Sequence, residues 1–194
     1  MTGRGRKAKF GGMFVYNRSM NTIYSSITLV VILFLSACAP KNEWTSHSVD
    51  NDAGILPYTF EYPSSWTIDP GNNYIGFVSD ADLLKDVPRK LNPGQIIVGL
   101  TMNITMEPEQ MVLIRSEGLD DIIRFSDPVS FSLNGRPAVY QEGVNMESKD
   151  ETLFIAADAG RNMRVLLTSR MAEGERTVWR ETLMSMVQTL QIKP

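Results

Sequence analysis

Cys38 is the only cysteine in this chain of 194 residues, so its possible chemistry is narrow. It has no disulfide partner within the chain and no companion for a thiolate metal site. A free thiol is unusual in an oxidising compartment, which leaves covalent modification of the sulfur as the chemistry to consider. The residues before Cys38 decide whether modification is expected.

Those residues form an export signal. Five basic side chains precede an uncharged apolar run from Ile27 to Leu35, and the first acidic residue, Glu43, comes only after this run. This run is too short to cross a bilayer comfortably, since a membrane-spanning helix needs roughly 20 apolar residues. Met13 and Met20 would also start a signal with the same apolar run, so the true start stays open.

The segment Leu35-Ser36-Ala37-Cys38 resembles the lipobox of bacterial lipoproteins. The resemblance implies that residues 1–37 are a signal peptide and that Cys38 carries palmitate or similar acyl chains. Two or three chains hold a protein firmly at a membrane, because each buried methylene contributes about 0.8 kcal/mol. The alternative is an incidental thiol within a cleaved signal. The expected location is the cell envelope, lipid-anchored to the cell membrane or the outer membrane and facing the extracytoplasmic side.

Residues for common catalytic sites are missing. His47 is the only histidine, and it precedes the first strand that we expect, where a Ser/His/Asp or Cys/His site could hardly be assembled. The nucleophile-elbow, phosphate-binding and dinucleotide-binding glycine motifs are absent from the sequence. We therefore expect a protein that is not an enzyme, with no catalytic residues and no cofactor.

Carboxylates are the remaining candidates for catalysis or metal binding. The segment after residue 79 departs from the EF-hand pattern, because Leu84 and Lys85 stand where a ligand and a glycine are needed. The alternative is a set of solvated acids at a helix start. Whether a metal binds is left open for two groups: Asp80, Asp82 and Asp86, and the pair Asp120 and Asp121.

Arginines near the carboxyl end form another candidate group. They could bind an anion or a carboxylate, although pairing with acidic side chains on solvated faces is the more common arrangement. The group comprises Arg161, Arg164, Arg170, Arg176 and Arg180.

Charge and length limit the function of the part that follows the signal. Five of the 19 basic residues lie before Cys38 and all 22 acidic residues lie after it, so residues 38–194 carry a formal charge of −8. This excess argues against nucleic acid as a partner. These 157 residues suffice for one domain. Because residues 38–55 are polar and lack an apolar period, we expect a lipidated tether there and a domain over 56–194.

Alternating apolar residues predict strands along most of the domain. Asn134-Gly135 predicts a tight hairpin, because both residues tolerate the positive φ angles of a type I′ turn. Trp66 is expected in the core, and the strand over 95–104 near the centre of the sheet. The expected strands cover 58–62, 74–78, 95–104, 129–133, 136–146, 151–157 and 163–169.

Three helices are expected. A brief one covers 80–86, and a second begins at Glu107-Pro108-Glu109 with Met111, Ile114 and Gly118 on its inner face. The third, over 175–190, is strongly amphipathic, with Trp179, Leu183, Met186, Val187 and Leu190 on one side. Strands grouped together with covering helices predict an α+β domain with an antiparallel sheet.

Three segments together resemble the PsbP-like superfamily: residues 58–66, the hairpin 134–138 and the closing helix that runs into Leu190-Gln191-Ile192. The resemblance covers roughly residues 55 to 192 and implies an antiparallel sheet covered by helices in an α/β/α sandwich. It also implies a non-catalytic binding or assembly role, without naming functional residues.

Two functions of different classes remain at this stage. The first is a membrane-anchored binding or assembly module whose partner is an envelope protein or a small ligand. The second is a ligand-handling or hydrolytic enzyme that uses a carboxylate-only site. A structural envelope lipoprotein is not distinguished from the first by these residues.

Overall fold

The structure is a computed structural model that describes residues 43–50, 56–70, 74–103 and 105–193. The export signal and Cys38 lie outside these residues, so their predictions remain predictions.

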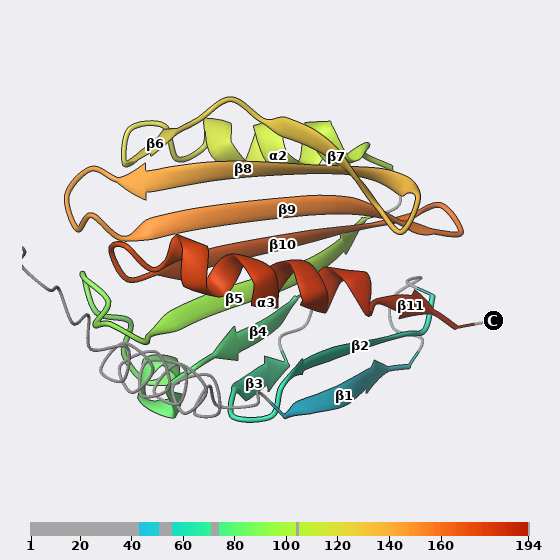
Figure 1. Ribbon diagram of the computed structural model, residues 1–194, viewed down its shortest axis with the longest axis horizontal. Helices are drawn as coiled ribbons and strands as arrows, with labels where there is room; N and C mark the ends of the chain where they lie inside the picture. Colours follow the sequence, from blue (N-terminus) through green and yellow to red (C-terminus); the bar gives the residue numbers. More distant parts are fainter. Residues whose placement is uncertain (1–42, 51–55, 71–73, 104, 194) are drawn as a thin grey trace, which may run out of the picture. The chain divides into compact units, whose positions relative to one another are not determined.

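An eight-stranded antiparallel sheet organises the described chain (Figure 1). Seven strands follow the order β3-β4-β5-β10-β9-β8-β6, and β7 pairs with β8 beside β6. The strands are β3 (Thr67–Pro70), β4 (Ile75–Val78), β5 (Ile96–Asn103), β6 (Ile123–Phe125), β7 (Val129–Leu133), β8 (Arg136–Asn145), β9 (Glu151–Gly160) and β10 (Met163–Met171).

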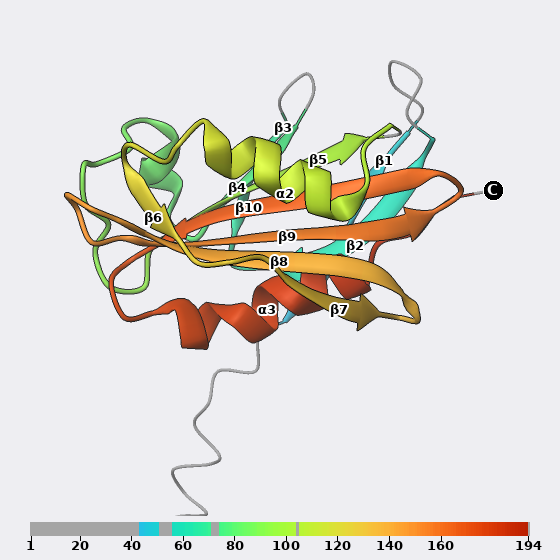
Figure 2. The same cartoon turned by 90° about the horizontal axis from the view of Figure 1, so that it is seen from above.

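Helices cover both faces of this sheet (Figure 2). α3 (Arg176–Gln188) packs on one face through Leu183, Met186 and Val187, and α2 (Pro108–Glu117) packs on the other through Met111 and Val112. Side chains along β9 point alternately to the two faces of the sheet, so this strand packs against both helices. The expected α/β/α arrangement is confirmed.

A second, three-stranded sheet of β1 (Trp44–Val49), β2 (Tyr58–Pro63) and β11 (Gln191–Ile192) contributes to the core on the α3 side. Phe60 of β2 is fully buried there and meets Phe77 of β4 edge to face. Trp66 is buried as expected and packs against Trp179 of α3, with the ring centroids 5.8 Å apart. No helix among the described residues is long and apolar enough to cross a membrane.

β1 corrects the expected tether over 38–55. Residues 44–49 form a regular antiparallel ladder with β2, in which His47 lies opposite Phe60 and Val49 opposite Tyr58. The polar residues of this strand hide its period, because its half-buried positions hold Thr, His and Val rather than a run of apolar side chains. The described domain therefore includes residues before 56, and the segment available as a tether between Cys38 and β1 is short.

The inner face of α2 also differs from the expectation. Ile114 is 55% exposed, whereas Val112 is fully buried and Ser116 is buried with its hydroxyl donating to the carbonyl of Leu113. The face of α2 that packs on the sheet therefore contains Met111, Val112 and Ser116.

The short strands β3, β6 and β11 lay outside the expected set. The hairpin prediction is confirmed: Asn134 and Gly135 have φ angles of 52° and 77° between β7 and β8. The 3₁₀ helix η1 (Ala81–Leu84) stands at the brief helix expected over 80–86.

Candidate functional site

The predicted carboxylates do not gather into a site. The Asp80 carboxylate caps η1, and hydrogen bonds from the backbone N–H of Asp82 and the Gln95 amide hold its pKa below the ordinary value. Asp82 pairs with Lys85 at 2.8 Å on the surface. Asp120 and Asp121 are exposed at the turn after α2. Among the described residues, no three His, Cys, Asp or Glu side chains are grouped as metal ligands would be.

The arginine group is divided among separate structural contacts. Each guanidinium is engaged by an acidic side chain or a carbonyl, so in the described part of the chain the five do not form a shared anion site. Their partners are Glu107 for Arg164 (3.0 Å), Asp150 for Arg170, Glu142 and Glu151 for Arg176 (2.9 and 2.6 Å), Glu142 for Arg180 (3.3 Å) and the Lys193 carbonyl for Arg161 (2.8 Å).

His47 lies on β1, with its ring 5.6 Å from that of Phe60. Phe60 belongs to the core on the α3 side of the large sheet. The imidazole therefore packs as an aromatic side chain on the small sheet.

A groove of about 750 Å³ lies on the face of the large sheet that α2 partly covers. Strands β4, β5, β10 and β9 form its floor. One wall comes from α2 and the residues after it, including Arg115, Leu119 and Ile123, and the other comes from η1 and the residues after it, including Leu84 and Val87. α2 covers β8, β9 and β10, so the sheet beyond β10 is left open between the two walls.

Two neighbouring glycines make the floor low. Gly76 of β4 lies opposite Gly99 of β5, and Gly99 lies opposite Thr168 of β10. Side chains normally rise from every second residue of a strand on each face, so a pair of glycines removes two of them from one cross-strand row. The complete row across the floor is Asp69, Gly76, Gly99, Thr168 and Phe154.

A Cβ atom at Gly76 would meet its nearest neighbour, a ring atom of Tyr74, at 3.4 Å, an ordinary contact distance. At Gly99, a Cβ would lie 3.1 Å from the Thr168 hydroxyl oxygen, which is tight. Close packing therefore does not require glycine at 76. Because glycine has no side chain, the space over residue 76 is left to the groove and is bounded by the Tyr74 ring and by Asp69.

The groove combines apolar walls with a few polar groups. Large apolar side chains stand partly in solvent along one rim: Tyr74 is 48% exposed, Leu84 43% and Val87 53%. Thr101 and Thr168 add hydroxyls to the floor, and Arg115 stands exposed on the α2 wall. This composition is typical of a small-molecule site, in which apolar surface is combined with a few polar groups that orient the ligand.

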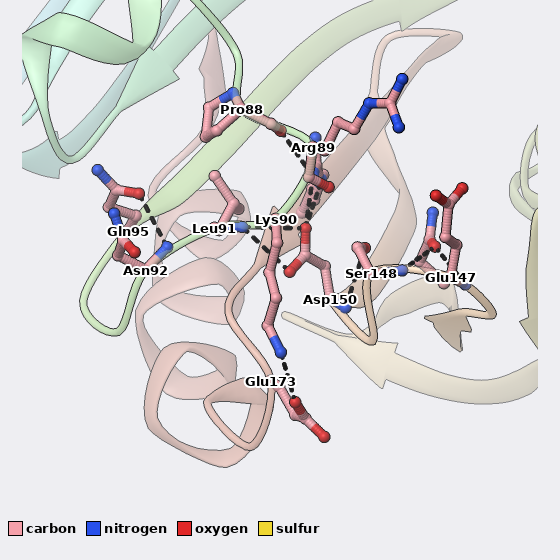
Figure 3. Close-up of polar contacts among 12 residues, drawn as sticks. Pro88, Arg89, Lys90, Leu91, Asn92, Gln95, Glu147, Ser148, Asp150 and Glu173 are labelled. Atoms are coloured by element: carbon pink, nitrogen blue, oxygen red, sulfur yellow. Dashed lines mark hydrogen bonds and ion pairs between the residues drawn. The ribbon is translucent and has the colours of Figure 1, made fainter.

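A buried carboxylate, that of Asp150, anchors the wall next to η1 and lies beside the segment 88–91 in Figure 3. Asp150 is fully buried, and its carboxylate accepts hydrogen bonds from the Leu91 N–H at 3.2 Å and from the Arg170 Nε at 2.7 Å. Arg170 also donates to the carbonyls of Pro88 (3.0 Å) and Arg89 (2.6 Å). The segment 88–91 is thus tied to β10 and to the start of β9. Since Val87 immediately precedes it, this network helps to set the position of the groove wall.

Comparisons of the described architecture with solved structures place it among known folds. The solution structure of cyanobacterial PsbP (CyanoP) from Synechocystis superposes with a TM-score of 0.52 at 8% identity, covering 80% of this chain and 96% of that one. The fold is PsbP-like.

A second match is LpqN of Mycobacterium tuberculosis, a protein described as involved in cell envelope biogenesis. It matches with a TM-score of 0.50 and 15% identity over 79% of this chain and 93% of that protein. No protein-family model matches the sequence, and the search of curated proteins found no match. At these identities the likeness shows the fold, as the sequence resemblance predicted, and it carries no residue roles.

The groove of this PsbP-like domain was not predicted from the sequence. Its signals were present, since glycine inside a strand often marks a close approach to the backbone, and both Gly76 and Gly99 lie inside expected strands. Their alignment across β4 and β5 depends on the register of two strands separated by η1 and a loop. That register is a tertiary property.

Proposed function

We propose that this protein is a membrane-anchored extracytoplasmic lipoprotein whose PsbP-like domain binds a ligand without transforming it. The groove above Gly76 and Gly99 carries the proposal, because it combines sufficient volume, apolar walls and few polar groups. The likeness to LpqN, a protein described as involved in cell envelope biogenesis, supports an envelope location.

Binding is favoured over catalysis by the groups that face the groove. Among the described residues, Asp69 is the one carboxylate that lines it, and it lies on the edge strand β3, on the side away from α2. The hydroxyls of Thr101 and Thr168 lie within reach of the carbonyls of Leu166 and Gly99, at 3.4 Å each. A nucleophile needs a neighbouring base, and the described lining supplies neither a histidine nor a second carboxylate.

The lipid anchor at Cys38 remains a proposal from the sequence, and β1 gives it a geometric consequence. Five residues, 39–43, separate Cys38 from Trp44. A chain of this length spans at most about 18 Å, so the acylated form of the protein would hold its domain close to the bilayer. A tether that extended to residue 55 would allow a much greater distance.

Metabolic labelling with an alkyne fatty acid tests the anchor. The wild-type protein should acquire the label and Cys38→Ala should not, whereas Ser36→Ala should still be labelled, because it keeps a small residue at its position. Equal labelling of Cys38→Ala would exclude acylation at this residue.

Photo-crosslinking in intact cells tests the groove. Benzoylphenylalanine in place of Tyr74, on the groove rim, should yield a specific adduct. The same replacement of Val178, which is 68% exposed on α3, should not, because α3 covers the opposite face. In the Tyr74 form, Gly76→Val should suppress the adduct by filling the floor. An adduct that survives this change, or no adduct from Tyr74, would contradict ligand binding in the groove.

A further inference from the structure

Among the described residues of the groove, one cationic group takes no part in a hydrogen bond or salt bridge of the fold. Of its two arginines, Arg170 is held by Asp150 and by the carbonyls of Pro88 and Arg89. Arg115 is exposed on the α2 wall, and among the described residues it forms no salt bridge. Four other arginines, Arg164, Arg170, Arg176 and Arg180, pair with carboxylates. A free guanidinium beside an apolar groove is suited to an anion that arrives with an apolar body.

The polar and apolar parts of the groove are separated. Arg115 stands on the α2 side, whereas Tyr74, Leu84 and Val87 form the opposite rim. Between them, Gly76 and Gly99 carry no side chains, which leaves room for an extended chain across β4 and β5 beside the Tyr74 ring and the Thr168 hydroxyl. Asp69, on the far edge strand, would repel an anionic group at that side and favours the orientation with the anion at Arg115.

We propose that the groove binds a long-chain fatty acid, with its carboxylate on Arg115 and its alkyl chain along the apolar rim. This inference rests on the proposed binding function and specifies the ligand class. A guanidinium matches a carboxylate in shape and charge, because its N–H groups can donate two parallel hydrogen bonds. The alkyl chain removes apolar surface of Tyr74, Leu84 and Val87 from water, which drives association. A domain held within reach of a bilayer would meet such amphiphiles at high local concentration.

The test uses the full chain in membranes and two photoactivatable probes of equal chain length, a diazirine fatty acid and the corresponding fatty alcohol. The acid should label residues of the groove walls, identified by peptide mapping, and should do so more strongly than the alcohol. Arg115→Gln should lower labelling by the acid about ten-fold, the loss expected when a charge-assisted hydrogen bond is removed, and should leave labelling by the alcohol unchanged.

Two further variants complete the test. Gly76→Val should abolish labelling by both probes, because it fills the floor. Arg124→Gln is the matched control: Arg124 is an exposed arginine on β6 that does not line the groove, so its loss removes the same charge without affecting binding.

The outcomes separate this inference from the proposed function. Equal labelling by acid and alcohol, unaffected by Arg115→Gln but lost in Gly76→Val, would overturn carboxylate recognition and leave the groove as a binding site. A protein adduct at Tyr74 with no labelling by either probe would overturn the fatty acid in favour of a peptide segment. Labelling that survives Gly76→Val would overturn the assignment to the groove, and the Tyr74 adduct would then decide whether the proposed function stands.

Discussion

Asp150 is the one charged side chain among the buried residues of the described domain, and it holds the loop beside the groove. A buried carboxylate loses its hydration on folding, and this cost is offset only if its hydrogen bonds and its charge partner are in place. Here the N–H of Leu91 and the guanidinium of Arg170 supply both.

Replacement of Asp150 by Asn should lower the free energy of unfolding by about 3 kcal/mol or more, the range for breaking a buried ion pair from one side. The Arg170 guanidinium would be left without its counter-ion in a half-buried position. Urea denaturation at pH 7 measures the change. Glu173→Gln is the control, because the Lys90–Glu173 pair is exposed and should contribute no more than about 1 kcal/mol. Equal effects of the two substitutions would contradict the role assigned to Asp150.

Tyr58 gives the domain a sensitivity to alkaline pH. Burial raises the pKa of the Tyr58 hydroxyl above its ordinary value of 10.0, because the phenolate would lose its hydration. The unfolded chain ionises at the ordinary value, so this contribution to stability is complete below pH 10 and is lost as the pH rises from there through the folded-state pKa.

Tyr58→Phe should therefore unfold at a higher urea concentration than the wild type at pH 11, and the advantage should be smaller or absent at pH 8. Phenylalanine cannot ionise and keeps the ring that packs near Phe60. Denaturation curves of both proteins at the two pH values measure the difference. A difference between the proteins that does not depend on pH would show that ionisation of Tyr58 has no part in alkaline unfolding.

Among the elements, the β7–β8 hairpin shows how a local signal fixes register. Asn134 and Gly135 both have positive φ angles, and the Asn134 amide also donates to the Gln188 carbonyl at the end of α3. The turn therefore sets the pairing of β7 with β8 and joins this pair to the helix that covers the sheet.

Gly135→Ala should destabilise the domain by roughly 1 kcal/mol, because an L residue with a Cβ is strained at positive φ. Gly118→Ala provides the matched control: Gly118 ends α2 with a φ of −75°, and nothing lies within 4 Å of a Cβ built there. That change should be neutral or stabilise by up to about 1 kcal/mol, since alanine has fewer unfolded conformations than glycine. Thermal unfolding of the two variants distinguishes backbone strain from simple loss of a glycine.

At the scale of the whole molecule, β1 decides where the folded domain begins. It covers one edge of β2 over six paired residues, while β11 pairs with the other edge over two. Without β1, an edge of β2 would be open to pairing with another chain, which is a common route to aggregation.

A chain that begins at residue 56 should therefore melt at a lower temperature and aggregate more readily than one that begins at residue 43. Both truncations remove the export signal, so they differ only in β1 and the segment that follows it. Calorimetry and light scattering on the two proteins measure the effect. Identical melting temperatures of the two chains would instead support a tether that extends to residue 55.

The elements that were predicted correctly share a strong local signal. The apolar positions of α3, the alternation of β5 and the Asn134-Gly135 turn can each be read within a short window, because helix and strand periods and turn geometry are local properties. β1 and the inner face of α2 lacked such a signal. The polar strand needed β2 as a neighbour, and the face that α2 buries depends on its packing against β8, β9 and β10.

The sequence by itself determined the class of fold, the acidic character of the domain and the prediction of an anchor at Cys38, since these depend on composition and local pattern. Tertiary structure alone decided the groove and the partners of the arginines. Gly76 and Gly99 become a hollow only when β4 and β5 pair in register, and Asp150 meets Arg170 only when β9 and β10 lie side by side. Contacts between residues far apart in the chain depend on the packing of the whole sheet, which no local pattern records.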